Sequence, residues 1–419
     1  MYMIYDFVIV GGGAAGLSAA ITFFNNASPS RRKKIVIIEH MDRIGKKILA
    51  TGNGRCNLSN ANISPEKYSS STPEILTNML AKMQPGTTLD FFHKLGLLCR
   101  TDADGRIYPY CNQASVVLDV MRDYISMAEI PVLCSCNVSS LATTPYGFLI
   151  STENHEPITT RNLLISTGGC AAPQLGSDGS GFGYARMLGH SINTIQPCLV
   201  SIESYTIDKS LKGVRTHCNA SLFKADGLIA QDTGEVQFIE HGLSGIPIFQ
   251  LSRFFEQTNR AYEYTICLDF FPEISYELLL LDITSRLESG RNKPIIDCLA
   301  GMLNNRLMLF LLKQLCPLYQ RNVKIADISK KDLISIVDGL KRFRIIPIQT
   351  LAWDKAQATR GGVPLSEINP ETCESLICPN LYFAGEILDV VGECGGYNLH
   401  WAWNTGILIG EAISRNSPL

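Results

Sequence analysis

The sequence has no apolar run of membrane-spanning length, little net charge and no Cys-x-x-Cys pair. A helix that crosses a bilayer needs about 20 consecutive apolar residues, so no membrane segment is expected. The first residues lack the basic stretch and cleavage site of a secretory signal, which makes the cytoplasm the expected location. A net charge of −2, with 18% charged residues, provides no general attraction for nucleic acid or for membranes.

Cysteine is frequent in this chain but scattered. Of the 14 cysteines only Cys134 and Cys136 stand two apart, and none has the spacing of metal ligands. In a reducing compartment such thiols act as small hydrophobic side chains. We therefore expect no metal ion and mostly buried thiols.

The N-terminal stretch predicts a nucleotide-binding turn. Residues 7–10 are a short apolar run, typical of a strand buried on both faces of a parallel sheet. A helical pattern follows, and the turn between them reads Gly-x-Gly-x-x-Gly. The first glycine permits the turn, the second lets a pyrophosphate approach, and the third lets the helix pack on the strand. The expected cofactor contacts here are Gly11, Gly13, Ala14, Ala15 and Gly16.

A second strand strengthens this interpretation, because a glycine-rich turn alone also occurs without any ligand. Ile35–Ile38 is a second apolar run, and Glu39 stands at its end, where an acid accepts a hydrogen bond from a ribose hydroxyl. The following segment, residues 45–57, is rich in glycine, lysine, arginine and asparagine, which suits an anionic or carbonyl-bearing ligand. From it we expect contacts by Lys46, Lys47, Gly54, Arg55 and Asn57.

The C-terminal segment has the same kinds of element: an apolar strand, glycine-rich turns and a helix. An apolar strand at 381–384 leads into Gly385-Glu386, and after a glycine-rich loop a helix begins near Tyr397. The positive end of that helix suits the flavin N1 and C2 region, which becomes anionic on reduction, and Glu386 is placed to bond ribityl hydroxyls. NAD alone would need no such second site, so FAD is the expected cofactor.

The remaining segments are read from their hydrophobic periodicity. Helices are predicted at 73–97, 116–130 and 184–188, and strands at 132–138, 148–152 and 163–166. The last strand ends in Thr167-Gly168, also expected at the cofactor. Residues 176–183 contain another Gly-x-Gly, but no apolar strand precedes it, so we do not interpret it as a second nucleotide site.

After residue 197 the pattern becomes β-rich. Strands are predicted at 199–202, 218–223, 234–239 and 264–268. Three helical stretches then lie between 275 and 340, the last with Ser329 as its N-cap.

Together these motifs resemble the aminoacetone-oxidase-like family of FAD flavoproteins, which includes a reductase proposed for dehydro bile acids and is related to glutathione-reductase-type flavoproteins. The resemblance runs through the chain in one order, through residues 11–39, 46–57, 167–181, 241–245, 361–363 and 384–399. It implies an α/β fold: a Rossmann-like FAD-binding domain of the glutathione-reductase type, an inserted β-barrel domain and a small helical domain. The implied limits are 1–195 and 357–419 for the FAD domain, 196–272 and 341–356 for the barrel, and 273–340 for the helical insert.

The resemblance also assigns residues to the cofactor. It implies that the backbone of Val138 contacts adenine, and that Arg55, Asn57, Glu386, Asn398 and Leu399 lie along FAD. Position 400 departs from the family pattern, where glutamine is expected and His400 stands instead.

The reaction is less fully specified. Only one dinucleotide fingerprint is present and no redox cysteine pair adjoins the flavin loops, which disfavours a disulfide reductase with its own NADPH domain. Electrons then come from an oxidised substrate, as in an amine oxidase, or from NAD(P)H bound transiently, as in a reductase of an activated alkene. Candidate proton-handling residues are His241, Tyr397 and His400.

The expected partner is a small-molecule substrate, with no nucleic acid. Two alternatives stay open: an FAD-dependent RNA-modifying protein, and a flavin-binding protein without turnover. The sequence does not indicate an oligomeric state.

Overall fold

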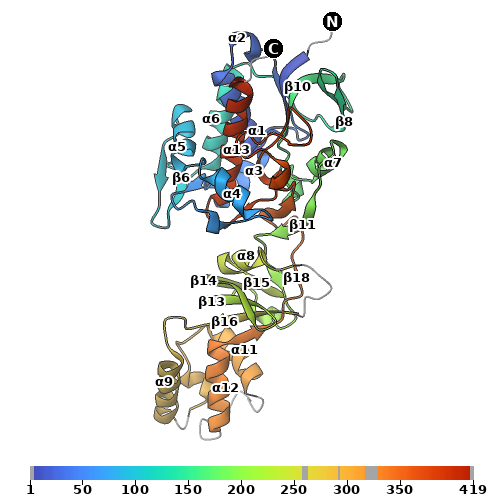
Figure 1. Cartoon of the computed structure of the whole chain (residues 1–419). Coiled ribbons are helices and arrows are strands. Elements are labelled where there is room, and N and C mark those ends of the chain that lie inside the picture. The colour runs from blue at the N-terminus through green and yellow to red at the C-terminus, as the bar shows by residue number, and fades with distance from the viewer. Residues whose placement is uncertain (1–3, 257–262, 291–292, 317–327, 416–419) are drawn as a thin grey trace. The chain divides into compact units, whose positions relative to one another are not determined.

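The structure is a computed structural model that describes residues 4–256, 263–290, 293–316 and 328–415. Its internal contacts divide the chain into two units. The first contains the residues up to Pro197 and those from Ala356 onward, and the second is Cys198–Lys355. The first unit is therefore assembled from both the early segment of the chain, blue to green in Figure 1, and the late segment, orange to red. The five-segment division expected from the sequence is finer and stays a prediction.

A sheet of seven described strands forms the centre of the first unit, in the order β7-β2-β1-β10-β9-β8 with β20 beside β10. Its parallel strands are β1 (Ile4–Val10), β2 (Ile35–Ile38), β7 (Val132–Leu133), β10 (Ile158–Ile165) and β20 (Leu381–Phe383). An antiparallel extension consists of β8 (Val138–Thr144) and β9 (Gly147–Thr152). Every residue of β2 and β20 is buried, as expected for parallel strands covered on both faces.

Two helices from opposite parts of the sequence, α1 (Ala14–Asn26) and α13 (Tyr397–Arg415), lie side by side in the first unit (Figure 1). A methyl group added at Gly406 would come 2.2 Å from the Ala15 carbonyl oxygen, and one at Gly410 would come 2.7 Å from that of Ala19. Only glycine permits this approach, which brings α13 against the helix that follows the glycine turn.

The other helices of this unit are α2 (Pro29–Arg32), α3 (Lys46–Ala50), α4 (Pro73–Leu80), α5 (Pro85–Lys94), α6 (Ala114–Met127) and α7 (Ser180–Met187). Short strands pair as β3 (Ser59–Asn60) and β5 (Cys99–Thr101) with β6 (Arg106–Pro109), β4 (Tyr68–Ser69) with β21 (Val391–Gly392), and β11 (Asn193–Cys198) with β19 (Ala358–Gly362). Two single turns matter below: η1 (Thr51–Gly54) and η8 (Gly385–Ile387).

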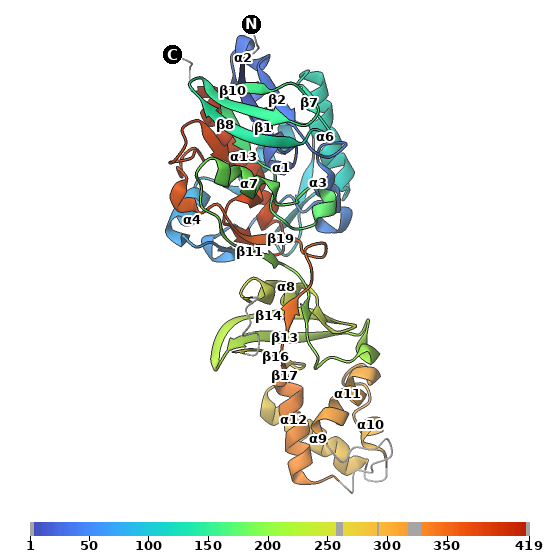
Figure 2. The same cartoon turned by 90° about the vertical axis from the view of Figure 1, so that its right-hand side faces the viewer.

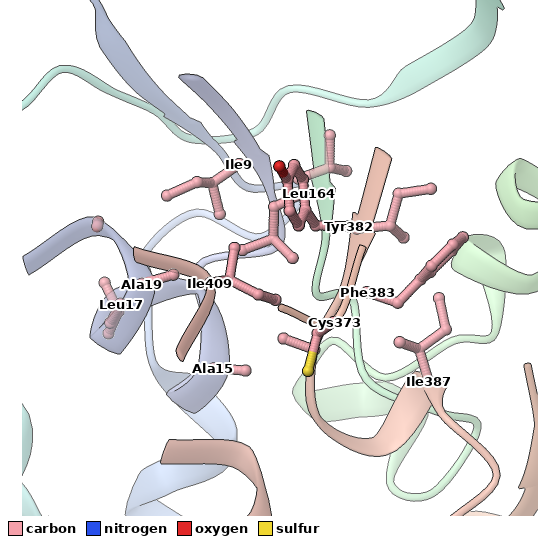
Figure 3. Packing of buried hydrophobic residues seen from close by; sticks show 14 of the residues in the cluster. Ile9, Ala15, Leu17, Ala19, Leu164, Cys373, Tyr382, Phe383, Ile387 and Ile409 are labelled. Carbon is pink, nitrogen blue, oxygen red and sulfur yellow. The ribbon is translucent and has the colours of Figure 1, made fainter. Parts of the chain in front are cut away.

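One hydrophobic cluster joins this sheet to its helices (Figure 3). Ile9 of β1, Leu164 of β10 and Tyr382 of β20 contribute from the strands, and Leu17 of α1 and Ile409 of α13 from the helices. All five are fully buried. Burying one such side chain stabilises a fold by about 1.5–3 kcal/mol, so this cluster fixes the late segment against the early one.

The second unit combines a sheet with a helical group (Figure 2). Its strand order is β17-β16-β13-β14-β15-β12-β18, comprising β12 (Ile202–Glu203), β13 (Arg215–Lys224), β14 (Gly227–Ile239), β15 (Gly242–Ser244), β16 (Tyr264–Asp269), β17 (Phe343–Ile345) and β18 (Gln349–Thr350). The helices are α8 (Ile246–Ser252), α9 (Tyr276–Ser289), α10 (Ile295–Cys298), α11 (Asn305–Leu315) and α12 (Lys330–Lys341). One buried cluster joins sheet and helices, and closure of this sheet into a barrel stays a prediction.

The start of α12 confirms a local prediction. Ser329 is the N-cap: its hydroxyl accepts a hydrogen bond from the Asp332 N–H at 3.1 Å, and the Asp332 carboxylate accepts one from the Ser329 N–H at 3.1 Å. This reciprocal capping box satisfies two N–H groups that a helix start otherwise leaves unpaired.

We expect Ser329→Ala to lower the free energy of unfolding of the second unit by about 1 kcal/mol, because the side-chain acceptor of the cap is lost. Urea denaturation followed by circular dichroism measures this. Ser329→Thr, which keeps a hydroxyl acceptor, is the matched control and should recover most of the loss. Equal losses in both variants would contradict the capping role.

Two predicted strands were wrong in extent, for the same physical reason. The predicted strand 132–138 is divided between β7 and β8, because Ser135 has a φ of +52° and turns the chain. The strand predicted at 199–202 begins only at Ile202, since Leu199 has a φ of +51°. A left-handed residue breaks an extended strand. The described part of 275–340 also holds four helices instead of three.

Among the residues that the structure describes, every helix is too short or too polar to cross a membrane. The same residues contain no group of three His, Cys, Asp or Glu side chains arranged to hold a metal ion. All 14 cysteines lie among the described residues and none of them forms a disulfide there; each except the exposed Cys111 is buried or half-buried. The thiols therefore act mainly as core side chains, as the sequence predicts.

Candidate functional site

The three glycines of the β1–α1 turn have three different physical requirements. Gly11 has a φ of +107°, and a methyl group there would come 2.5 Å from the Ser166 carbonyl oxygen. A methyl group at Gly16 would come 2.0 Å from the Gly11 carbonyl oxygen. At Gly13 it would meet no atom within 4 Å, so that position opens onto empty space. Gly11 and Gly16 are thus needed for the fold, whereas Gly13 leaves room for a ligand.

Helix α1 starts without any side-chain cap and without an acidic residue in its first turn. Its first N–H groups are therefore left for another acceptor, and the helix dipole adds partial positive charge at the same place. This arrangement suits a phosphate.

A large cavity opens in front of this helix start. It holds about 1200 Å³ of space not filled by protein atoms, its open mouth included. Its walls come from within residues 10–15, 38–51, 136–138, 166–184 and 384–402, with Gln357. Both the early and the late segments of the chain therefore enclose it, which matches a long dinucleotide cofactor.

Fourteen of the residues expected at the cofactor line this cavity, and their contact with the cofactor itself stays a prediction. They are Gly11, Gly13, Ala14, Ala15, Glu39, Lys46, Lys47, Val138, Thr167, Gly168, Gly385, Glu386, Asn398 and Leu399.

Glu39 is fixed at the end of β2 and is only 8% exposed. One carboxylate oxygen accepts a hydrogen bond from the Gly12 N–H and the other from the Met41 N–H, each at 2.9 Å. Each oxygen keeps a lone pair for a further donor such as a ribose hydroxyl. Glu39 thereby also holds the glycine turn in place, a second task that sequence reasoning did not predict.

At another part of the wall, Lys47 of α3 and Glu386 of η8 form an ion pair, with Nζ 2.9 Å from Oε2. The other carboxylate oxygen of Glu386 is buried and has no hydrogen-bond partner within the described chain. The same holds for the hydroxyl of Thr167, which also lines the cavity. Buried polar atoms are normally paired, so these two atoms mark where a polar ligand completes the structure.

Asn398 lies in the first turn of α13 but its side chain is engaged with the preceding loop. Its Oδ1 accepts from the Gly392 N–H at 2.8 Å, and its Nδ2 donates to the Gly392 carbonyl oxygen at 3.0 Å. The loop continues through Gly395 and Gly396, both with positive φ. Asn398 therefore shapes the wall of the cavity and presents the start of α13 to it.

These features fit FAD, and the comparisons with known proteins agree. The family described as "HI0933-like protein Rossmann domain" matches residues 5–412. The chain belongs to this family. The HI0933-like fold combines a Rossmann-type FAD-binding domain with additional domains, as predicted, and the chain is an FAD-dependent oxidoreductase.

The HI0933-like chain has full-length relatives of named activity. It is 34% identical to the 3-dehydro-bile acid delta(4,6)-reductase of Clostridium scindens, covering 97% of this chain and 98% of that protein. It is 26% identical to the ribosomal RNA dihydrouridine synthase of Escherichia coli, covering 96% of each. A solved 3-ketosteroid delta1-dehydrogenase from Sterolibacterium denitrificans has a TM-score of 0.51 at 11% identity, covering 98% of this chain and 99% of that one, which is a likeness of fold alone.

Four residues expected at the cofactor of this HI0933-like protein do not line the cavity. Gly16 lies beneath the turn. Gly54 ends η1 and Arg55 follows it, and both are exposed. The Arg55 guanidinium lies over the Tyr108 ring, 4.8 Å from its centre. Asn57 is 8% exposed, and its Oδ1 is buried without a hydrogen-bond partner in the described part of the chain. Their roles at the flavin stay predictions.

None of the three candidate proton-handling residues is among the residues that line the cavity. His400 is fully buried; its Nε2 lies 2.8 Å from the Met83 carbonyl oxygen and its Nδ1 lies 2.8 Å from the Ser59 hydroxyl. Burial lowers the pKa of His400 to about 4, so the ring is neutral at physiological pH. This placement does not support proton exchange between His400 and a substrate.

Tyr397 and His241 are placed differently. Tyr397 is 5% exposed and packs edge-on against Tyr68, and burial raises its pKa, which keeps the phenol protonated. His241 is exposed in the turn between β14 and β15 of the second unit. The structure thus gives Tyr397 a packing role, and a catalytic role for His241 stays a prediction.

Cys373 and Cys378 have the four-residue spacing of a flavin-linked disulfide pair, which the sequence reading did not single out. Both are buried free thiols outside the cavity wall. Burial raises the pKa of Cys373 to about 12 and also raises that of Cys378. A thiol that resists ionisation is a poor redox nucleophile, so this pair belongs to the core.

Sequence reasoning missed part of the cavity wall. Gly176, Ser177 and Ser180 line it. Their segment was part of the family resemblance and was rejected as a second nucleotide site, but none of its residues was predicted to contact the cofactor. Tyr184 lines it too, and its hydroxyl donates to the Val138 carbonyl oxygen at 2.8 Å. The sequence signal that could have identified these residues was the run of glycine and serine after Thr167-Gly168. It supplies small polar groups, although no strand directly precedes it.

Proposed function

We propose that this protein reduces a carbon–carbon double bond conjugated to a carbonyl group in a small organic substrate, with FAD as the hydride carrier and NAD(P)H as a transient electron source. Bound FAD supplies the hydride chemistry at N5. The protein supplies the helix start for the pyrophosphate, Glu39 for the ribose, and the unpartnered oxygen of Glu386 for a ribityl hydroxyl.

The observation that carries this proposal is the full-length relationship to a named reductase. Because it extends over 97% of the chain, it includes both segments that enclose the cavity. A 3-dehydro steroid with a double bond at position 4 is a conjugated enone. Uridine, the precursor of the dihydrouridine named in the second relative, likewise carries a double bond conjugated to a carbonyl. Both names therefore support one reaction class, which favours a reductase over the amine oxidase that the sequence left open.

An RNA substrate is the second candidate, because of the rRNA dihydrouridine synthase relatives. Binding structured RNA relies on a cluster of basic side chains that neutralise phosphates. The helical stretch from 273 to 340 has nine basic and eight acidic residues, and the whole chain has a net charge of −2. This balance favours a small substrate.

The test uses the purified protein with its FAD reduced anaerobically by light. We expect a 3-keto-4-ene steroid to reoxidise the flavin at least about tenfold faster than a matched saturated ketone does, because only the conjugated alkene accepts the hydride. Absorbance of the flavin follows the reaction, and mass spectrometry detects two added hydrogens in the product. Reoxidation by ribosomal RNA but not by the enone would favour the second candidate. Reduction of oxidised flavin by amines, with no enone activity, would contradict the proposal.

A further inference from the structure

The Lys47–Glu386 ion pair joins two elements that the protein fixes independently. Lys47 lies on α3, which starts at Gly45 with a φ of +76°; a methyl group there would come 2.2 Å from a Leu118 methyl carbon of α6. Helix α3 is therefore set by close packing against α6.

Glu386 is fixed from the other side by α13. The Trp401 indole N–H donates to the Gly385 carbonyl oxygen at 3.1 Å, and the Gly385 N–H donates to the Thr405 hydroxyl at 3.0 Å. Both α13 side chains are buried. The two members of the ion pair thus meet across the cavity wall without either one depending on the other for its place.

The pair has capacity for a ligand on both members. Glu386 uses one carboxylate oxygen for Lys47, and its other oxygen is buried and unpartnered within the described residues. The Lys47 ammonium has three N–H donors, of which one is directed at Glu386. The side chains are 26% and 19% exposed, so they are only partly screened by water.

From this geometry we infer that Lys47 and Glu386 are a charge pair that sets the reduction potential of the bound flavin. The inference rests on the FAD-dependent function proposed above. Reduction makes the flavin ring system anionic, and charges near it tune its electronics. In a partly water-excluded cavity, a unit charge acts over several ångströms with little screening. The ammonium favours the reduced form, the carboxylate opposes it, and together they nearly cancel.

This role predicts shifts of opposite sign, measured without any substrate. In Lys47→Met the unpaired Glu386 carboxylate should lower the flavin reduction potential. In Glu386→Gln the unpaired ammonium should raise it. The double variant should return close to the wild-type value, because the net charge at the site is then restored. Photoreduction in the presence of a reference dye measures all four potentials.

The matched control is Lys67→Met, which removes the same charge from an ion pair with Glu393, where Lys67 lies outside the cavity wall. Its potential should equal that of the wild type. Shifts of the same sign in both single variants, or no shift in either, would overturn the inference. If Lys47→Met retains no FAD, the Glu386→Gln variant alone tests the inference: a raised potential supports it, and a lowered or unchanged potential overturns it. If both lose FAD, Lys47→Arg and Glu386→Asp should restore it, and failure to do so would also overturn the charge role.

The outcome is separable from the proposed function. Wild-type protein that binds FAD but reduces no conjugated alkene would refute the proposed reaction class. The measured potentials of the variants would still test the charge pair. Opposite shifts combined with enone activity would support both.

Discussion

Gly13→Ala is expected to weaken FAD binding by about 10- to 100-fold while leaving the stability of the protein without FAD nearly unchanged. The backbone of Gly13 has a φ of −86°, which alanine adopts readily, and an added methyl group meets no protein atom within 4 Å. That methyl group instead occupies the space where the pyrophosphate approaches the turn. The resulting steric overlap weakens the binding free energy of FAD by about 1–3 kcal/mol. Flavin fluorescence titration of the FAD-free protein measures the loss.

Gly16→Ala is the matched comparison, since it adds the same methyl group three residues later. There the methyl group would come 2.0 Å from the Gly11 carbonyl oxygen, so the helix and the strand must separate. We expect this variant to unfold at markedly lower temperature even without FAD. Equal stability loss in both variants would contradict the division between a ligand-facing and a packing glycine.

His400→Gln is expected to remove much of the acid sensitivity of the fold. The folded-state pKa of His400 is about 4, below the ordinary 6.5. Between these values the unfolded chain binds a proton that the folded protein does not, so stability falls as pH drops through this window. Between about pH 7 and about pH 5, protonation of this one group in the unfolded chain lowers the free energy of unfolding by about 2 kcal/mol. Urea unfolding of both proteins at the two pH values measures the difference.

Glutamine is a suitable replacement because it reproduces the hydrogen bonds of the neutral ring. The Met83 carbonyl oxygen can only accept, so Nε2 of His400 carries the hydrogen and Nδ1 accepts from the Ser59 hydroxyl. A glutamine amide offers the same donor and acceptor. Other groups, such as the buried His190, titrate in both proteins and cancel in the comparison. The same pH dependence in both would show that His400 is not responsible.

The sequence predicted the parallel strands β1, β2 and β20 of the first sheet because these elements obey local rules. Apolar runs such as Ile35–Ile38 have one favourable location, between two layers, and the structure buries that strand completely. The cavity followed from glycine spacing and from Glu39, since a strand end, a turn and a helix start lie at fixed offsets along the chain.

The sequence could not predict contacts between individual side chains that lie far apart along the chain. The proximity of Lys47 to Glu386 depends on how α3 and η8 pack, and nothing near either residue encodes the other. His400 illustrates the same limit: a histidine beside a cofactor motif suggests proton transfer, but its side chain turns toward Met83 and Ser59 in the core. The left-handed backbone at Ser135 and Leu199, neither of which is glycine, was equally invisible to strand patterns.

The packing of α13 on α1 through Gly406 and Gly410 has a consequence for biosynthesis. A ribosome translates the glycine turn early and η8 with α13 far later, so the nascent chain holds only one wall of the cavity for most of its synthesis. Truncated translation products that end before α13 would lack one wall of the cavity and would not bind FAD. Bound flavin therefore indicates that synthesis has continued past this helix.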